Sequence, residues 1–303
     1  MKLVTRLSLA TSLILVFSVA TLAGARVDTV RFQSKLVNAT LPYNVILPSD
    51  YDISPTTRYP VLYLLHGLTG HYSDWVTRTN VADYASQYRM IVVTPEGNDG
   101  WYTDSSTVAT DKYESYILKE LIPDVQQRYR TIEARYGRAI AGLSMGGYGS
   151  IKFGVKSPVT FVFVGSMSGA FGETRMSEQE AGASRWGAAL KLFGPIDSET
   201  RKANDLFLLL KELQPNRVAG LPFFYFDCGT EDSARIFPYN RELAALMLEK
   251  KIPHEYRELP GDHSWGYWDK QVQEVLKIAA EKMRIPPNPT STKKPTRKLK
   301  PSA

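Results

Sequence analysis

The sequence predicts an α/β fold in which helices cover both faces of a mostly parallel sheet. Two observations carry this prediction. Short apolar runs alternate along the chain with segments that are apolar at every third or fourth residue. Most of these runs are apolar at every position, as expected for strands that are buried on both sides. With 303 residues, 43% of them hydrophobic, the chain can bury such a core within one domain.

The expected strands follow in chain order. Residues 27–37 and 43–47 alternate and should pair antiparallel at one edge of the sheet. A more polar run at 255–259 favours a position near an edge. Continuous apolar runs predict central strands at 60–65, 91–95, 138–142, 161–164 and 221–226.

Helical patterns fall between the strands, at 111–129, 145–155, 240–250 and in a last helix that carries Trp268 and Met283 on one face. Pro123 should kink or restart the first of these helices, because proline lacks the backbone N–H. One stretch, about 170–220, shows no strand pattern. It contains two short helical patterns, at 186–192 and 206–213, and we interpret it as a cap-like insertion over a site.

The chain begins with the pattern of a cleavable signal peptide. Lys2 and Arg6 precede an apolar run at 7–22, and small residues follow at 23–25. Residues 1–25 are therefore expected to direct secretion or periplasmic export, and the mature chain to start near Arg26. The alternative is an uncleaved anchor, but the run is short for a bilayer span. No later segment is apolar for long enough to cross a membrane.

The net charge of +6 comes from the two ends. Without the two cations of 1–25 and the five of 285–303, 30 cations face 31 acids. The body at 26–284, the expected catalytic domain, is thus nearly neutral, which argues against a nucleic-acid partner. The Pro- and Lys-rich tail at 285–303 should be disordered. A weak contact with anionic envelope polymers is one interpretation of this tail, and a plain solvated terminus is the other.

Ser144 is the expected nucleophile. It lies in the sequence Gly-Leu-Ser-Met-Gly-Gly at 142–147, directly after an apolar strand and before a helix. On such a sharp turn Gly142 and Gly146 are required, because side chains would clash in the bend. The turn lifts the hydroxyl above the sheet, and the helix N-terminus favours developing negative charge. The lone Cys228 is a weaker candidate, since it ends an apolar run and is expected to be packed.

A serine nucleophile needs a base, and His263 is the expected one. It lies in the loop 261–265, between the last strand and the last helix. His66, in the turn after the first central strand, is expected to hold that turn. His71, in the loop beyond, could approach a substrate, and His254 begins a strand, as a packing or surface histidine would.

The third member should follow a strand between the serine and the histidine, where Asp227, Glu231 and Asp232 occur. Asp227 ends the strand and is expected to satisfy turn amides. The spacing alone does not separate the other two. For the oxyanion, the expected backbone donors are Met145, which follows the nucleophile, and Leu68, in the loop 66–70.

Four sequence patterns occur in order: His66-Gly67 with Trp75 downstream, and the runs at 142–147, 227–232 and 261–265. Together they resemble the esterase D family of the α/β-hydrolase superfamily, over about 41–283. This family includes S-formylglutathione hydrolases, feruloyl esterases, tributyrin-type esterases and the antigen 85 mycolyltransferases. The resemblance implies an α/β-hydrolase fold and selects Asp232, the last acid of its segment, as the catalytic acid.

The resemblance also implies that the loop at 100–105 borders the active site, so that Trp101 and Tyr102 could line a substrate pocket. Packing beneath the loop is the alternative. The oxyanion donors that the resemblance implies are the same two residues, Leu68 and Met145.

The expected function is hydrolysis of short-chain acyl or aromatic, feruloyl-type esters by an exported serine carboxylesterase. No metal or organic cofactor is expected, and the partner is a small-molecule ester or an acylated saccharide. Two alternatives stay open: an acyltransferase onto a sugar hydroxyl, and a non-catalytic surface-binding module on a hydrolase scaffold. The intact set of serine, acid and histidine argues against the second.

Overall fold

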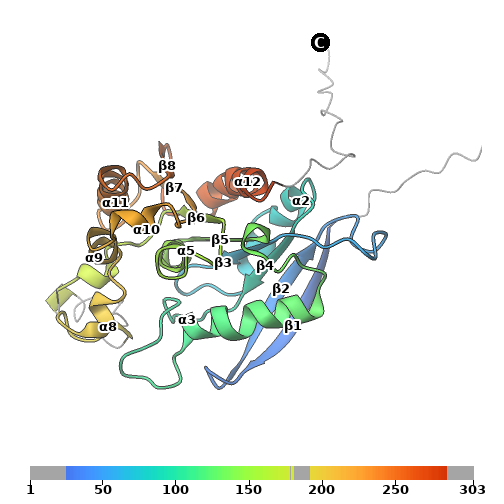
Figure 1. Ribbon diagram of the computed structural model, residues 1–303, viewed down its shortest axis with the longest axis horizontal. Coiled ribbons are helices and arrows are strands. Elements are labelled where there is room, and N and C mark those ends of the chain that lie inside the picture. Colours follow the sequence, from blue (N-terminus) through green and yellow to red (C-terminus); the bar gives the residue numbers. More distant parts are fainter. Residues whose placement is uncertain (1–24, 178, 181–191, 285–303) are drawn as a thin grey trace, which may run out of the picture.

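The computed structural model describes residues 25–177, 179–180 and 192–284 (Figure 1). All but the last residue of the predicted signal peptide, the tail at 285–303 and nearly all of the helical pattern at 186–192 lie outside these residues. Within them, no helix combines the length and the apolar character needed to cross a membrane.

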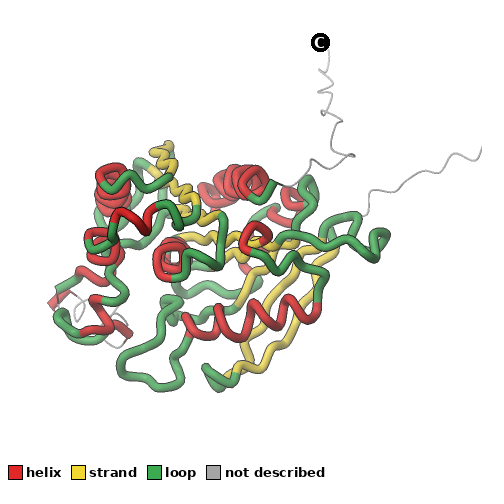
Figure 2. The backbone as a smooth tube through the Cα atoms, viewed as in Figure 1, coloured by secondary structure: helices red, strands yellow, loops and turns green. Residues whose placement is uncertain are grey.

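The core of the molecule is one eight-stranded sheet with the order β1-β2-β4-β3-β5-β6-β7-β8, drawn in yellow in Figure 2. β1 pairs antiparallel with β2, and β2 with β4, whereas every other pairing is parallel. The predicted α/β fold with an antiparallel edge pair is therefore confirmed. The strands are β1 (Arg26–Ser34), β2 (Ala39–Leu47), β3 (Val61–Leu65), β4 (Ile91–Pro95), β5 (Arg138–Leu143), β6 (Phe163–Met167), β7 (Phe223–Gly229) and β8 (His254–Leu259).

Two hydrophobic cores lie on the two faces of this sheet. In β3, Leu62 and Leu64 pack into one core while Tyr63 packs into the other, as the alternation of side chains in a strand requires. The first core is covered by α1 (Asp74–Arg78), α2 (Val81–Ala85) and α12 (Trp265–Lys282). The second is covered by α3 (Tyr113–Tyr116), α4 (Ile122–Arg128), α5 (Met145–Lys156), α9 (Leu206–Lys211) and α11 (Phe237–Glu249).

Pro123 restarts its helix, as predicted. It occupies the first turn of α4, where proline is tolerated. The join with α3 is a π-helical turn, η1 (Ile117–Leu121), which takes up the irregular hydrogen bonding.

The sixth strand differs from its prediction, since the sequence places it at 161–164 and β6 runs from Phe163 to Met167. Residues 165–167 lack an apolar strand pattern but belong to β6, because the packing of α12 on the sheet leaves room only for a small residue at Gly165. A side chain on Gly165 would stand 3.0 Å from Ala141 Cβ and 3.2 Å from Val275 Cγ1, where α12 crosses the sheet. The insertion between β6 and β7 contains η3 (Glu173–Arg175), α8 (Glu199–Lys202), α9 and α10 (Pro215–Val218).

Parallel register brings five loops to one edge of the sheet. β5 ends beside β6, with Leu143 opposite Met167, and β6 ends beside β7, with Met167 opposite Asp227. β7 in turn ends beside β8, with Gly229 opposite Leu259. The loops that follow these strands, together with the loop after β3, surround a common point above the carboxyl edge.

Candidate active site

Ser144 stands on a strained turn between β5 and α5. Its φ of 52° and ψ of −114° are rare for a residue with a side chain. The flanking glycines are required by contact. A Cβ on Gly142 would lie 2.5 Å from the Gly146 backbone, and one on Gly146 would lie 2.5 Å from the His66 carbonyl oxygen. The chain therefore makes this turn only with glycine two residues before and two residues after the serine.

Ser144, His263 and Asp232 form a continuous hydrogen-bonded row. His263 Nε2 lies 3.0 Å from Ser144 Oγ, and His263 Nδ1 lies 2.9 Å from Asp232 Oδ2. The Asp232 side chain is fully buried, while about a third of the imidazole is exposed. An ionised acid at Nδ1 requires the proton on that nitrogen, so Nε2 carries the lone pair that faces the serine hydroxyl.

Close backbone contact holds the acid loop against the histidine loop. A Cβ on Gly229 would lie 2.2 Å from the Gly261 carbonyl oxygen, and Gly261 itself has a φ of 142°, which favours glycine. Trp268 packs edge-on against the imidazole, with 4.9 Å between ring centroids. The orientation of His263 is thus fixed from two sides.

The neighbouring acids have other contacts. Asp227 was expected to satisfy turn amides, and this expectation is wrong for its side chain. Its Oδ1 accepts a hydrogen bond from the Tyr267 hydroxyl at 2.8 Å, and its burial raises the pKa of this carboxyl to about 7. Asp262 accepts from the Ser264 hydroxyl. Cys228 is buried as expected, and burial beside Asp232 raises the pKa of its thiol.

His66 supports the loop after β3, as expected. Its Nε2 accepts the Gly97 N–H at 2.9 Å, so Nδ1 donates to the Gly67 carbonyl at 2.7 Å. Nε2 also lies 3.3 Å from Glu96 Oε1. Because Nε2 accepts the Gly97 N–H, it carries no proton that it could donate to this carboxylate. His71 lies 3.3 Å from the same glutamate, on its other oxygen.

The two candidate oxyanion donors come from two segments, the start of α5 and the loop after β3. Met145 is the first residue of α5, so its N–H has no acceptor within the helix. In the loop after β3, the Thr69 N–H donates to Asp99 Oδ1 and the Gly70 N–H to the Gly67 carbonyl. Leu68 and Ser144 line the same cavity, so the Leu68 N–H stays the candidate donor from this loop.

Two cavities meet at Ser144 and His263. The first, of about 480 Å³, is called here the oxyanion cavity; its other lining residues include Gly67, Leu68, Leu143, Trp265 and Trp268. The second, of about 340 Å³, is called the Trp101 cavity; its other lining residues are Trp101, Ala170, Gly172, Glu173, Ser233, Arg235 and Ile236. An ester bound at Ser144 has two halves, and the two cavities offer a place for each.

Trp101 and Tyr102 have different surroundings in the structure. Both have a φ of 49°, a strained backbone for bulky residues. Trp101 lines the cavity named after it and packs edge-on against Tyr148 and Phe193. Tyr102 is fully buried and donates its hydroxyl to the His66 carbonyl at 3.2 Å, so it supports the loop from beneath.

A buried lysine on α5 holds this loop in place. Lys152 donates to the Tyr102 carbonyl at 2.8 Å and to the Thr103 hydroxyl at 2.5 Å. It also lies 3.0 Å from Glu114 Oε2. Burial lowers the pKa of Lys152 to about 8, even though Glu114 opposes this shift.

Glu173, Arg235 and Ile236 were not singled out from the sequence. Glu173 lies in the insertion, and Arg235 and Ile236 lie between the acid and α11. None of them belongs to a periodic pattern or to one of the four ordered runs. The sequence offers only one signal for Glu173, its position shortly after the end of a strand at the carboxyl edge.

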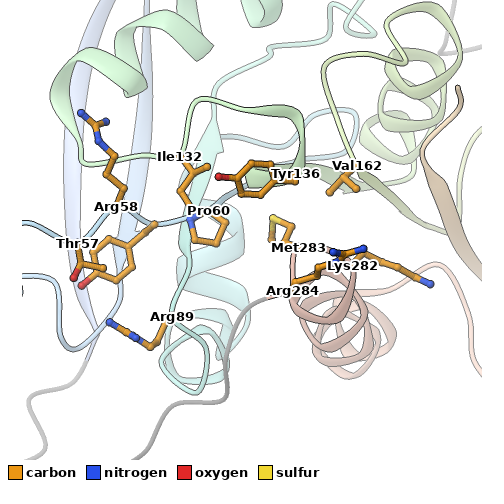
Figure 3. A pocket seen from close by; sticks show the side chains of 11 residues that line it. Thr57, Arg58, Pro60, Arg89, Ile132, Tyr136, Val162, Lys282, Met283 and Arg284 are labelled. Carbon is orange, nitrogen blue, oxygen red and sulfur yellow. The ribbon is translucent and has the colours of Figure 1, made fainter.

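A larger cavity of about 620 Å³ lies away from this site. Pro60, Ile132 and Val162 line it, and these residues precede β3, β5 and β6, which places the cavity at the amino edge of the sheet (Figure 3). Two of its cations have acidic partners, since Arg58 pairs with Glu133 and Arg89 with Asp50. It has neither Ser144 nor His263 in its lining.

The Esterase family model matches residues 34–278. An acetyl esterase of Caldicellulosiruptor saccharolyticus is 25% identical over 80% of this chain and 94% of its own length. The esterase Rv1288 of Mycobacterium tuberculosis is 30% identical over 77% of this chain, which spans only 54% of that relative. Among solved structures, a ferulic acid esterase superposes with a TM-score of 0.73 at 28% identity, covering 86% of this chain and 99% of its own.

A fluorophosphonate-binding serine hydrolase of Staphylococcus aureus gives a TM-score of 0.73 at 25% identity, over 85% of this chain and 99% of its own. The family match covers most of the chain, and these neighbours share both its fold and its class of chemistry. The chain belongs to the Esterase family and is a serine hydrolase that acts on carboxylic ester bonds.

Proposed function

We propose that this chain is an exported carboxylesterase that hydrolyses short-chain acyl or aromatic, feruloyl-type esters through a covalent acyl-enzyme on Ser144. The observation that carries the proposal is the row from Ser144 Oγ through His263 to Asp232, with bonds of 3.0 and 2.9 Å. The similarity to an acetyl esterase and to a ferulic acid esterase supports the two acyl classes.

The proposed reaction has two steps. Ser144 Oγ attacks the ester carbonyl carbon while His263 Nε2 takes its proton, and Asp232 stabilises the imidazolium. The negative oxygen of the intermediate accepts hydrogen bonds from the N–H groups of Leu68 and Met145. The imidazolium then gives its proton to the leaving alcohol as the C–O bond breaks. Water attacks the acyl-enzyme with His263 again as base, which releases the acid and restores the serine.

Burst kinetics and active-site labelling test the hydrolase assignment. With p-nitrophenyl butyrate in excess, we expect a burst of about one p-nitrophenol per chain where deacylation is slow, followed by steady turnover. A fluorophosphonate probe should label the wild type and a Ser150→Ala control, but not Ser144→Ala. Labelling that persists in Ser144→Ala would reject Ser144 as the nucleophile. A wild-type chain that neither turns over the ester nor reacts with the probe would reject the hydrolase and favour a binding module.

A rate series over acetate, butyrate, hexanoate and methyl ferulate would define the acyl class. An acyltransferase is the second candidate, because this chain is 27% identical to the diacylglycerol acyltransferase/mycolyltransferase Ag85A of Mycobacterium tuberculosis over 76% of its length. Turnover of the butyrate ester with trehalose present separates the two. A hydrolase yields butyrate at any trehalose concentration, whereas a transferase yields butyryl-trehalose at the expense of butyrate.

We further propose export by a signal peptide at residues 1–25, a folded esterase domain at 26–284 and a basic tail at 285–303. The charged start and the short apolar run support the first assignment. N-terminal sequencing of the exported protein should begin at Arg26. A mature protein that still begins at Met1 would show that residues 1–25 are not cleaved and would favour an N-terminal anchor.

A further inference from the structure

The Trp101 cavity contains an acid that the proposed mechanism does not use. Glu173 lies on the cavity wall together with Ser144 and His263, and its side chain is about nine-tenths buried. Its Oε1 is fully buried and has no hydrogen-bond partner within residues 25–177, 179–180 and 192–284. Burial raises the pKa of this carboxyl to about 7, although Arg235 and Arg201 oppose the shift.

The position of Glu173 is fixed by its own segment. A Cβ on Gly172 would lie 2.2 Å from the Tyr239 ring, so the backbone before Glu173 is pressed against α11. Arg235 also lines the cavity, and its Nη1 donates a hydrogen bond to Met176 Sδ at 3.6 Å. Arg235 and Arg201 act on Glu173 only through longer-range electrostatics, and its Oε1 has no hydrogen-bond partner in the described part of the chain.

A buried carboxyl oxygen without a partner is unfavourable, and such a group in a folded protein calls for an explanation such as a functional role. The remaining walls of the cavity are largely apolar, formed by Trp101, Ala170 and Ile236. The chemistry of this lining fits a ligand with an apolar or aromatic body and one hydrogen-bonding group.

We infer that Glu173 recognises a hydroxyl group on the half of the ester that occupies the Trp101 cavity, and so selects hydroxylated esters over their deoxy counterparts. This inference rests on the proposed function, because the cavity opens onto Ser144. The hydroxyl can belong to the acyl half, as in a phenolic acid, or to the alcohol half, as in a polyol. Both sources share the same chemistry, and the experiment separates them.

Two matched substrate pairs test the inference. Methyl 4-hydroxycinnamate against methyl cinnamate varies the acyl half, and glycerol monobutyrate against propyl butyrate varies the alcohol half. For one of these pairs, the wild type should favour the hydroxylated ester in kcat/KM by about tenfold or more. Glu173→Leu should lower that ratio to within about twofold of one. Glu173→Gln should give an intermediate ratio, because an amide still forms hydrogen bonds.

Glu199→Gln is the matched control. Glu199 is another acid of the insertion, but it is 92% exposed and pairs with Lys202 on the surface, so its replacement should leave both ratios unchanged. If Glu173→Leu does not fold, the ratio in Glu173→Gln decides. A ratio equal to the wild type in both pairs overturns the inference, as does a wild type that prefers neither hydroxylated ester.

Failure of the inference differs visibly from failure of the proposed function. In the first case p-nitrophenyl butyrate is still hydrolysed and the Ser144 probe still reacts, while the ratios do not depend on Glu173. In the second case no ester is turned over and no label is found on Ser144, and both proposals fall together.

Discussion

The two cavities that meet at Ser144 differ in how the chain builds them. The oxyanion cavity is lined by the immediate neighbours of the ordered sequence runs: the loop after β3, the end of β5 and the start of α12. The Trp101 cavity is assembled from Trp101, the segment at 170–173 and the segment at 233–236, which are far apart in sequence. Chemistry that a family shares depends on local turns, whereas the shape that selects a substrate depends on long-range packing.

Each cavity also has a lining element that is hydrogen-bonded to a buried ionisable side chain. Asp227 accepts from Tyr267 of α12, the helix whose Trp265 and Trp268 line the oxyanion cavity. Lys152 holds the loop of Trp101 through the Tyr102 carbonyl. Four substitutions test this difference between the oxyanion cavity and the Trp101 cavity, and they follow from the largest expected effect to the smallest.

Ser144→Ala should have the largest effect. Without the hydroxyl no acyl-enzyme can form, so kcat for p-nitrophenyl butyrate should fall by on the order of 10⁴–10⁶. Steady-state kinetics would show this fall, and Ser150→Ala, two turns along α5, should stay within a few-fold of wild type. Activity retained in Ser144→Ala would move the chemistry to another residue.

Asp232→Asn should lower kcat by on the order of 10²–10⁴, because an amide can hold His263 in the wrong tautomer and cannot stabilise its cation. Asp262→Asn is the control, since Asp262 is adjacent to His263 in sequence but bonds to Ser264. The same assay checks both variants. If Asp262→Asn proves the more damaging of the two, the acid has been assigned to the wrong loop.

Lys152→Met should destabilise the fold by about 3–5 kcal/mol, because it leaves buried acceptors at Tyr102, Thr103 and Asn204 without their donor. It should also disturb the Trp101 cavity. Lys156→Met removes the second cation beside Glu114 from a position that is 26% exposed, and should cost far less. Urea unfolding measures both. Equal costs would mean that burial of Lys152 adds nothing to the loop.

Asp227→Asn should change how stability depends on pH. The folded pKa of about 7 lies above the usual value near 4, so the folded state binds more protons between these limits. Stability therefore falls as pH rises from about 4 to 7, and the penalty is complete above 7. Asparagine removes this penalty, so the variant should gain about 1–3 kcal/mol on the wild type between pH 5 and pH 8.

Unfolding curves at pH 5 and pH 8 check this prediction. Asp83→Asn, an exposed position on α2, should unfold with the wild-type pH dependence. A difference between Asp227→Asn and wild type that stays constant with pH would contradict the titration of this buried carboxyl.

Much of the fold followed from the sequence because its signals are local. Apolar runs predicted the central strands and alternating or more polar runs predicted the edge strands, each to within a few residues, and Pro123 predicted the start of α4. The error at β6 has a tertiary cause. The sequence at 165–167 has no strand pattern, so it is predicted as a loop. In the structure α12 packs against this part of the sheet, and only a small residue fits at Gly165.

The site divides in the same way. Ser144, His263 and the loop of Leu68 carry local signals, whereas the choice among Asp227, Glu231 and Asp232 did not follow from spacing. The structure gives these acids different surroundings: Oδ2 of Asp232 lies 2.9 Å from the imidazole, and Asp227 turns to Tyr267. The side-chain direction at a strand end depends on the neighbouring strand and helix, which one-dimensional spacing does not contain.

By itself, the sequence determined the sheet, the glycine-flanked turn at Ser144 and the order of the loops at its edge, because each depends on nearby residues and on backbone geometry. Only the tertiary structure decided that Tyr102 supports the loop while Trp101 lines the cavity, and that Glu173 on the wall of that cavity has an Oε1 with no hydrogen-bond partner among the described residues. Those outcomes depend on burial and on contacts between distant segments, and burial is a property of the folded chain as a whole.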